Sequence, residues 1–378
     1  MIRTDCIYYK GESPCSFHKK YGIECNEKCP YYKKIKKRIL IIKKDALGDV
    51  LRTTPILHAI KAKYGQSTHI TWLISPYAYD LIKYNHLIDR AYKFNFESMI
   101  CLQAEKFDVL FSLDKDKASL ALSKLINAEE KYGFTLNEYG NLTIFNQKGE
   151  YALRLGLSDN FKKKNEKSYP EFICELGELP YSRKFKYIFN VPNLADLKKD
   201  FIEKFNLNKK TSIIGFNPGS KFKTRIWPKK YWVDLGIKLI KEINATILLF
   251  GAKLEIELNN FIYKSIQSEL SNNLKGNIIN TGSNNNLFEL SALISLTDIL
   301  VSADTLGSHI AIALEVPSIV LYGPTPSQEI DLFETGQKII ANSSCLICYK
   351  EECDNSVHCL SLIKISDVFQ KIIEILNN

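Results

Sequence analysis

Two blocks of alternating strand-like and helix-like segments constrain the fold of this 378-residue chain more than any other feature. The first block begins with a continuous apolar run over 39–42, which is typical of a strand buried on both faces. The second block begins with a strand-like run over 211–216 and is the more regular of the two. Strands that alternate with helices form parallel sheets covered on both faces. We therefore expect an α/β fold with two Rossmann-like domains that face one another and are joined near residues 186–205.

Hydrophobic spacing predicts the remaining elements of both blocks. In the first block we expect strands over 69–75, 107–113 and 131–134, and helices over 50–64, 77–84 and 118–126. Pro55 must either begin the regular part of the 50–64 helix after Thr54 or kink it. In the second block we expect strands over 245–251, 277–281, 298–302 and 318–322, and helices over 231–243, 255–270, 287–296 and 308–314. A terminal helix is expected over 363–376.

Composition and charge narrow the class of protein. An apolar content of 45% argues against global disorder. The net charge of +9 includes the basic run over 33–38, which is interpreted as a solvated edge or as a surface attracted to anionic lipid headgroups. Binding to nucleic acid is a weaker interpretation of this run, and we expect no nucleic-acid partner. With no long apolar segment and no secretory signal, we expect a cytoplasmic protein, with peripheral contact at the inner face of the inner membrane as an open alternative.

Asp49 follows Gly48 directly after the first buried strand, where a helix begins. Ligands of open α/β sheets bind at the carboxyl ends of the strands. A carboxylate at this position is either a helix-capping group or a general base that takes a proton from an attacking acceptor hydroxyl. Asp45 is the local competitor for the role of base. From the residues alone, both interpretations of Asp49 stay open.

Two segments of the second block are suited to bind an anion. A helix that begins near residue 305 offers free backbone N–H groups, and glycine permits close approach of a phosphate. The loop over 217–228 combines a glycine turn with three cations that can neutralise a diphosphate leaving group without a metal. The candidate donor-binding residues are Asn217, Gly219, Ser220, Lys223, Arg225, Asp304, Thr305, Leu306, Gly307 and His309. The alternatives are a simple capped helix, a packed histidine and a solvated basic loop anchored by Trp227.

These segments resemble glycosyltransferase family nine, the ADP-heptose:lipopolysaccharide heptosyltransferases. The resemblance rests on residues 39–57, 217–228 and 304–325, and it runs from about residue 38 to residue 376. It implies a GT-B fold and an inverting mechanism without a catalytic metal. It also implies that Asp49 is the general base and that Asp304, Thr305 and Gly307 line the donor site. Arg225 stands where the family usually has a lysine, which keeps the charge but changes its geometry from a point to a fork.

Eight of the ten cysteines lie near the two ends of the chain. The carboxyl-terminal set consists of Cys345, Cys348, Cys353 and Cys359, and the amino-terminal set consists of Cys6, Cys15, Cys25 and Cys29. Clustered thiols in a cytosolic protein bind metal more often than they form disulfides. We expect structural zinc or iron at the carboxyl-terminal set, with His358 as a substitute ligand. The amino-terminal set is looser in spacing, with His18 nearby. Reduced thiols without metal, or ligands shared between the sets, are the alternatives.

The function predicted from these features is inverting transfer of heptose from ADP-heptose to a lipopolysaccharide core acceptor. Asp49 would be the base, while Arg225, Lys223 and Thr305 would stabilise the departing diphosphate. The predicted domains are a cysteine-rich segment over 1–37, an acceptor-side domain over 38–190, a donor domain over 191–344, and a cysteine-rich loop with a terminal helix over 345–378. Acceptor specificity is expected within 136–185. The alternatives are a protein acceptor such as an autotransporter, another surface glycan or sugar, and a non-catalytic metal-stabilised scaffold.

Overall fold

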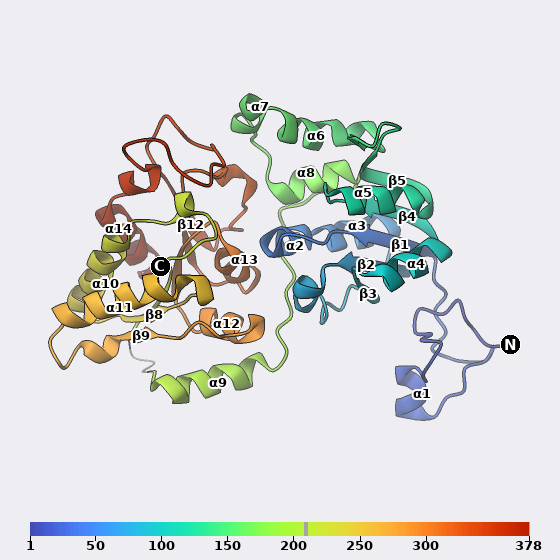
Figure 1. Cartoon of the computed structure of the whole chain (residues 1–378). Coiled ribbons are helices and arrows are strands. Elements are labelled where there is room, and N and C mark those ends of the chain that lie inside the picture. The colour runs from blue at the N-terminus through green and yellow to red at the C-terminus, as the bar shows by residue number, and fades with distance from the viewer. Residues whose placement is uncertain (208–210, 378) are drawn as a thin grey trace. The chain divides into compact units, whose positions relative to one another are not determined.

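A computed structural model describes residues 1–207 and 211–377 (Figure 1). These residues form two compact units. The first unit comprises residues 1–154 and 170–185, and the second comprises residues 155–169 together with the chain from Lys186 onward. The last residue of the predicted 345–378 segment lies outside the described residues.

The first unit alternates strands with helices around one sheet. Its elements are α1 (Ser16–Tyr21), β1 (Lys37–Ile42), α2 (Leu47–Thr53), α3 (Ile56–Tyr64), β2 (Thr68–Ile74), the 3-10 helix η1 (Pro76–Leu81), β3 (Arg90–Lys93), α4 (Phe96–Ala104), β4 (Lys106–Ser112), α5 (Lys117–Leu125), β5 (Asn127–Leu136), β6 (Leu142–Ile144), η2 (Gln147–Gly149) and α8 (Tyr169–Leu176). The helix α6 (Glu150–Leu157) ends in the stretch assigned to the second unit, where α7 (Asp159–Lys163) follows.

The first sheet has the strand order of a dinucleotide-binding fold. Among the described residues its six strands follow the order β3-β2-β1-β4-β5-β6, and all neighbours are parallel except β5 and β6. The order reverses between β1 and β4, where Ile42 lies opposite Ser112. Crevices at such reversal points are where open α/β sheets bind ligands. The residues that follow β1 and β4 therefore share one functional edge of the sheet.

The second unit repeats this plan with a fully parallel sheet. Its elements are α9 (Leu194–Phe205), β7 (Ile213–Asn217), η3 (Lys223–Arg225), α10 (Lys229–Ile243), β8 (Thr246–Leu249), η4 (Lys253–Glu255), α11 (Ile256–Glu269), η5 (Lys275–Asn277), β9 (Ile278–Asn280), α12 (Leu287–Ile294), β10 (Ile299–Ala303), α13 (Leu306–Ala313), β11 (Ser318–Tyr322), η6 (Ser327–Glu329), β12 (Gly336–Ile340), η7 (Cys359–Leu362) and α14 (Ile365–Leu376). Within the described chain the order is β12-β11-β10-β7-β8-β9, so that the reversal lies between β7 and β10.

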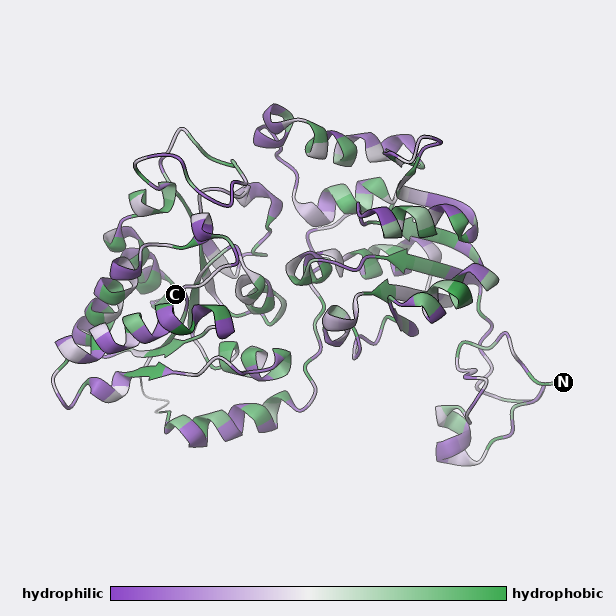
Figure 2. Ribbon diagram, viewed as in Figure 1, coloured by the Kyte–Doolittle hydropathy of each residue, from purple (hydrophilic) through white to green (hydrophobic). Residues whose placement is uncertain are grey.

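Apolar strands form the centre of each unit, as the hydrophobic colouring of the sheets shows (Figure 2). Residues 39–42 of β1 are fully buried, which explains why this strand reads as a continuous apolar run rather than an alternating one. In the second unit, Trp227 and Trp232 pack edge to face at 5.3 Å in a core shared with α10, α11 and α14. Trp227 also donates from its indole nitrogen to the carbonyl of Ile363 at 3.2 Å, which connects the basic loop to the end of the chain.

The elements differ from the sequence expectations in a few places. Pro55 divides the expected 50–64 helix into α2 and α3, and the expected 77–84 helix is the shorter 3-10 helix η1. The strands β3 and β12 and the helices α4 and α9 were not expected. The two strands are short and partly exposed at the sheet edges, so their hydrophobic pattern is weak. Residues 136–185, for which no helix was predicted, contain the three helices α6, α7 and α8.

Among the described residues, no helix combines the length and the apolar composition that crossing a bilayer requires.

Candidate active site

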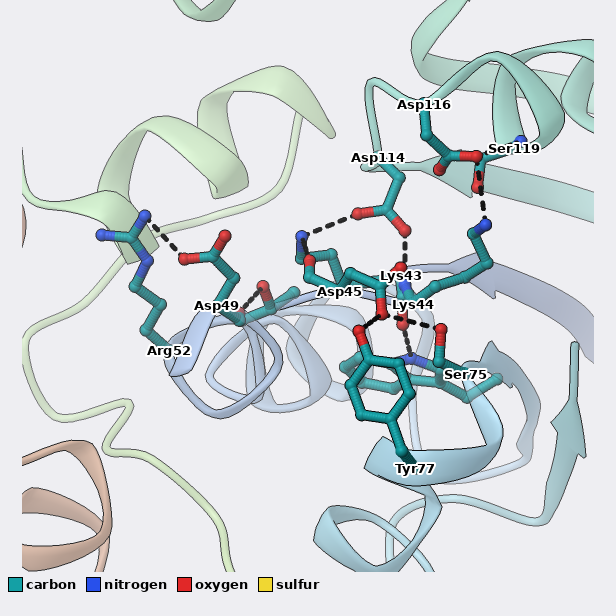
Figure 3. Close-up of polar contacts among 12 residues, drawn as sticks. Lys43, Lys44, Asp45, Asp49, Arg52, Ser75, Tyr77, Asp114, Asp116 and Ser119 are labelled. Atoms are coloured by element: carbon teal, nitrogen blue, oxygen red, sulfur yellow. Dashed lines mark hydrogen bonds and ion pairs between the residues drawn. The ribbon is translucent and has the colours of Figure 1, made fainter. Parts of the chain in front are cut away.

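Asp49 lies in the first turn of α2, immediately after the loop that leaves β1 (Figure 3). Its carboxylate is 38% exposed, and Arg52, one turn further along the helix, places Nη2 2.9 Å from Oδ1. The N-cap position belongs to Ala46, whose methyl group cannot accept a hydrogen bond. The geometry thus leaves Asp49 oriented by a neighbouring guanidinium and open to solvent.

Asp45, the competing carboxylate, is engaged by two hydroxyl groups. Ser75 donates its Oγ hydrogen to Asp45 Oδ1 at 2.7 Å, and the phenol of Tyr77 donates to the same oxygen. Burial, followed by the hydrogen bond to Asp45, raises the pKa of Tyr77 to about 12. The phenol therefore remains a donor at neutral pH. This arrangement engages one of the two Asp45 carboxylate oxygens.

Two lysines hold the loop between β1 and α2 against the end of β4. Lys43 Nζ lies 2.7 Å from Asp114 Oδ1 in a pair that is almost completely buried, and Lys44 Nζ lies 3.0 Å from Asp116. The backbone N–H of Lys44 donates to the other Asp114 oxygen. Burial raises the pKa of Asp114, although Lys43 and the Lys44 amide oppose that shift. These contacts position the loop that carries Asp49.

The second unit has a polar cluster at its own reversal point, between β7 and β10. Asn217 ends β7, and its Nδ2 donates to Ser302 Oγ at 3.0 Å and to Thr305 Oγ1 at 2.8 Å. A Cβ atom at position 307 would lie 2.5 Å from Asn217 Nδ2, so glycine is required for the first turn of α13 to approach this closely. Ser308 Oγ accepts a hydrogen bond from the N–H of Thr305 at 3.2 Å, which is a capping contact at the N-terminus of α13.

Arg225, Asp304 and His309 lie next to one another beside this cluster. Arg225 Nη1 is 4.0 Å from Asp304 Oδ2 and 3.5 Å from the Asp304 carbonyl oxygen. His309 Nε2 is 3.5 Å from the other carboxylate oxygen. The imidazole is buried, and its ring packs near Tyr187. His309 is therefore both a packed residue of α13 and a contact of Asp304.

The other members of the predicted donor set lie in different environments. Lys223 is 83% exposed and pairs with Glu352 at 3.3 Å, whereas Arg225 is largely buried. A Cβ atom at position 219 would lie 2.0 Å from Glu255 Cγ, so this carboxylate packs directly against the glycine turn. Leu306 is the half-buried first residue of α13, and Ser220 accepts from the N–H of Phe222 at 3.4 Å.

Sequence reasoning missed three of these groups, namely Lys43, Asp114 and Glu255. Asp114 directly follows the expected 107–113 strand, so its position at a strand end was a usable signal. Its significance depends on the pairing of β1 with β4, which hydrophobic spacing does not reveal. Glu255 belongs to the turn after β8, and nothing in the local sequence connects it to Gly219.

The carboxyl-terminal cysteines gather near the end of β11 but do not form a metal site in this structure. Cys359 Sγ is packed against Gly323, and a Cβ atom there would lie 2.6 Å from the sulfur. Burial raises the pKa of the Cys359 thiol, and the three other cysteines of the set raise it further. Throughout residues 1–207 and 211–377, no three His, Cys, Asp or Glu side chains are grouped to hold a metal ion. The expected centre at Cys345, Cys348, Cys353 and Cys359 is therefore not assembled here.

Most of the chain matches the model of one known protein family. The family model of glycosyltransferase family 9 (heptosyltransferase) matches residues 99–358. The chain belongs to this family. The predicted family is confirmed, and the protein is a glycosyltransferase enzyme. Lipopolysaccharide heptosyltransferase 1 of Campylobacter coli is 25% identical over 351 residues, which cover 89% of this chain and 98% of that protein.

Solved structures confirm the fold class of this family 9 member. Escherichia coli ADP-heptose LPS heptosyltransferase II has a TM-score of 0.66 at 19% identity, over 90% of this chain and 98% of that one. TibC of enterotoxigenic Escherichia coli, described as an iron-containing dodecameric glycosyltransferase, has a TM-score of 0.53 at 11% identity, over 90% and 79% of the respective chains. At these identities the likeness extends to the fold alone: an α/β architecture with two predominantly parallel sheets.

Proposed function

We propose that this glycosyltransferase transfers heptose from ADP-heptose to a hydroxyl of a lipopolysaccharide core acceptor, with inversion at the anomeric carbon. The observation that carries the proposal is that Asp49 and the Asn217–Thr305 cluster each lie at the reversal point of their own sheet. The names of the Campylobacter relative and of the Escherichia coli heptosyltransferase II support the sugar, donor and acceptor class. Neither name favours a protein acceptor or a non-catalytic scaffold.

In the proposed reaction Asp49 removes the proton of the acceptor hydroxyl as its oxygen attacks the anomeric carbon. The bond from that carbon to the donor oxygen breaks, and ADP departs with the electron pair. A partly exposed carboxylate oriented by Arg52 is suited to this step, since an acceptor hydroxyl can approach it from solvent. Asp45 is less suited, because Ser75 and Tyr77 already donate to it.

The donor would bind at the start of α13, where Asp304, Thr305 and Gly307 follow β10. Backbone N–H groups at a helix N-terminus stabilise phosphate oxygens, and a glycine leaves them accessible. Arg225 brings a cation to this turn through its contacts with Asp304. Its guanidinium offers a fork of donors for two phosphate oxygens. Lys223, which is exposed and paired with Glu352, would play a secondary part.

Conservative substitution of the two carboxylates tests the assignment of the base. Asp49→Asn should lower kcat by about 10²–10⁴-fold, the usual contribution of a positioned general base, while the affinity for ADP is retained. Asp45→Asn is the matched control and should retain most of the turnover. Release of ADP in the presence of acceptor measures turnover, and calorimetric titration measures ADP binding. Near-normal turnover of Asp49→Asn together with inactive Asp45→Asn would assign the base to Asp45 instead.

We also infer that Cys345, Cys348, Cys353 and Cys359 form a structural zinc or iron site, with His358 beside it. The loop has an unusual backbone, since Ile347 and Tyr349 on either side of Cys348 have φ of +57° and +53°. Their N–H groups donate to Gly323 and Pro324 at 3.0 Å, which holds the loop next to Cys359. The iron that TibC contains adds support. Metal analysis of Cys345→Ser against the parent tests it.

A further inference from the structure

The amino-terminal 36 residues hold a defined conformation with almost no hydrophobic core. Cys6 is the only buried residue in the range 1–38, and α1 contributes none. Backbone bonds at 2.9 Å from Ile7 to Lys33 and from Ile35 to Asp5 close the segment on itself. Chains shorter than about 40 residues rarely fold without disulfides, metals or a partner. This segment therefore needs a source of stability other than apolar burial.

All four cysteines of the segment line a single cavity. Cys6, Cys15, Cys25 and Cys29 surround a volume of about 360 Å³, although they are spread over 24 positions of sequence. Each of them is a free thiol, so no disulfide closes the segment. Within the part of the chain that the structure describes, no three such side chains come together tightly enough for a single ion. The four cysteines thus line one cavity whose volume is larger than a single ion occupies.

Aromatic rings form part of the wall of this cavity. Phe17 stacks on Tyr31 at 4.1 Å and meets Tyr8 edge to face at 4.8 Å. His18 also lines the cavity, but its Nδ1 donates to the carbonyl of Ile23 at 3.0 Å, which orients the ring through the backbone. The four cysteines are therefore the thiol ligands that the cavity offers, with the His18 ring beside them. Apolar walls of this kind restrict the access of water to a bound cluster.

We propose that Cys6, Cys15, Cys25 and Cys29 hold an iron–sulfur cluster that folds the amino-terminal segment. Four cysteine thiolates are the usual ligands of such clusters, and the bridging sulfides let the ligand sulfurs stand further apart than they do around one ion. Binding to the folded segment but not to the unfolded chain would supply the missing stability. The cluster takes no part in the glycosyl transfer proposed above, because its ligands are distinct from Asp49 and from the donor-binding residues.

Iron and acid-labile sulfide in the anaerobically purified full-length protein test the proposal. We expect about two or about four atoms of each per chain, according to cluster type, with a visible absorption band that dithionite bleaches. The double variant Cys25→Ser/Cys29→Ser should lose the sulfide. Cys101→Ser, an exposed cysteine of α4, is the control for an unrelated thiol. Cys345→Ser/Cys348→Ser controls for a metal at the other end, which would carry no sulfide.

A second measurement keeps the test valid if the double variant folds poorly. Cluster-free parent protein, prepared by chelation, should become sensitive to protease within residues 1–36, and iron plus sulfide should restore the protection. Stoichiometric zinc without sulfide, metal-free protein with a protected segment, or sulfide retained in Cys25→Ser/Cys29→Ser would each overturn the proposal. Loss of sulfide with normal ADP release would support it while leaving the transfer reaction intact.

Discussion

The buried pair between Lys43 and Asp114 is the residue-scale contact on which the Asp49 loop depends most directly. Both side chains are about 95% buried, since 5% and 6% of their surfaces remain exposed. Charges removed from water in this way are tolerated only while each keeps its partner. The neighbouring pair differs because Asp116, the partner of Lys44, is 43% exposed and remains solvated.

We predict that Lys43→Met destabilises the protein by about 3–5 kcal/mol near neutral pH, because Asp114 is left as an uncompensated buried carboxylate. Burial raises the pKa of Asp114 in the folded protein. The stabilisation that comes from this shift is complete below the pKa of the unfolded chain, where the carboxyl is protonated, and it is lost as the pH rises through the pKa of the folded protein. The loss caused by Lys43→Met should therefore be smaller in acid and should grow with pH. Urea unfolding across a pH series measures it. Lys44→Met is the matched control, and an equal, pH-independent loss in both variants would contradict the argument.

At the scale of elements, close contact between the first turn of α13 and the end of β7 shapes the donor-side cluster. The contact exists because position 307 has no side chain, which lets Asn217 bond Ser302 and Thr305. Gly276 in η5 offers a comparison, since a Cβ there would meet nothing within 4 Å.

We predict that Gly307→Ala lowers the free energy of unfolding by about 1–3 kcal/mol, the usual cost of forcing an extra methyl group into a packed contact. It should also weaken ADP binding, because the Asn217 side chain must leave Thr305. Gly276→Ala should leave both quantities unchanged. Chemical unfolding and calorimetric titration with ADP provide the two readouts. Unaltered ADP affinity in a folded Gly307→Ala variant would separate this turn from the donor site.

Over the whole molecule, the positive charge is concentrated at one end of the chain. Residues 1–38 contain ten Lys and Arg against four Asp and Glu, which accounts for six of the nine net positive charges. Lys34 and Lys36 are both exposed. Basic residues near an anionic bilayer contribute about 1 kcal/mol each to binding, and salt screens that attraction. An acceptor carried on lipid would make such an attraction useful.

We predict that the protein partitions onto anionic lipid vesicles and that added salt releases it. Lys34→Gln/Lys36→Gln should weaken partitioning by about 2 kcal/mol, or roughly thirtyfold, at low salt. Lys199→Gln/Lys241→Gln removes the same charge from exposed positions of the second unit and should have a much smaller effect. Co-sedimentation with vesicles measures both. Equal losses in the two variants would show that net charge alone governs the interaction.

Much of the fold was predictable because the relevant signals are local. The buried strands at 39–42, 211–216 and 318–322 and most helices follow from apolar spacing that a strand or helix imposes on its own residues. Pro55 predicted a break, and the backbone places it between α2 and α3. Short, half-exposed edge strands such as β3 carry too weak a pattern to be read in this way.

The residues of the candidate site also differ in whether local sequence could identify them. Asp49 and the turn at Gly307 could be recognised from sequence, because each follows a strand directly and belongs to a motif that resembles one family. The spacing of apolar residues within a segment does not determine which strands pair in the sheet. The pairing of β1 with β4 brings Asp114 to Lys43, and the packing of η4 brings Glu255 to Gly219. Such contacts join residues tens of positions apart, so they exist only once the chain has folded around its two sheets.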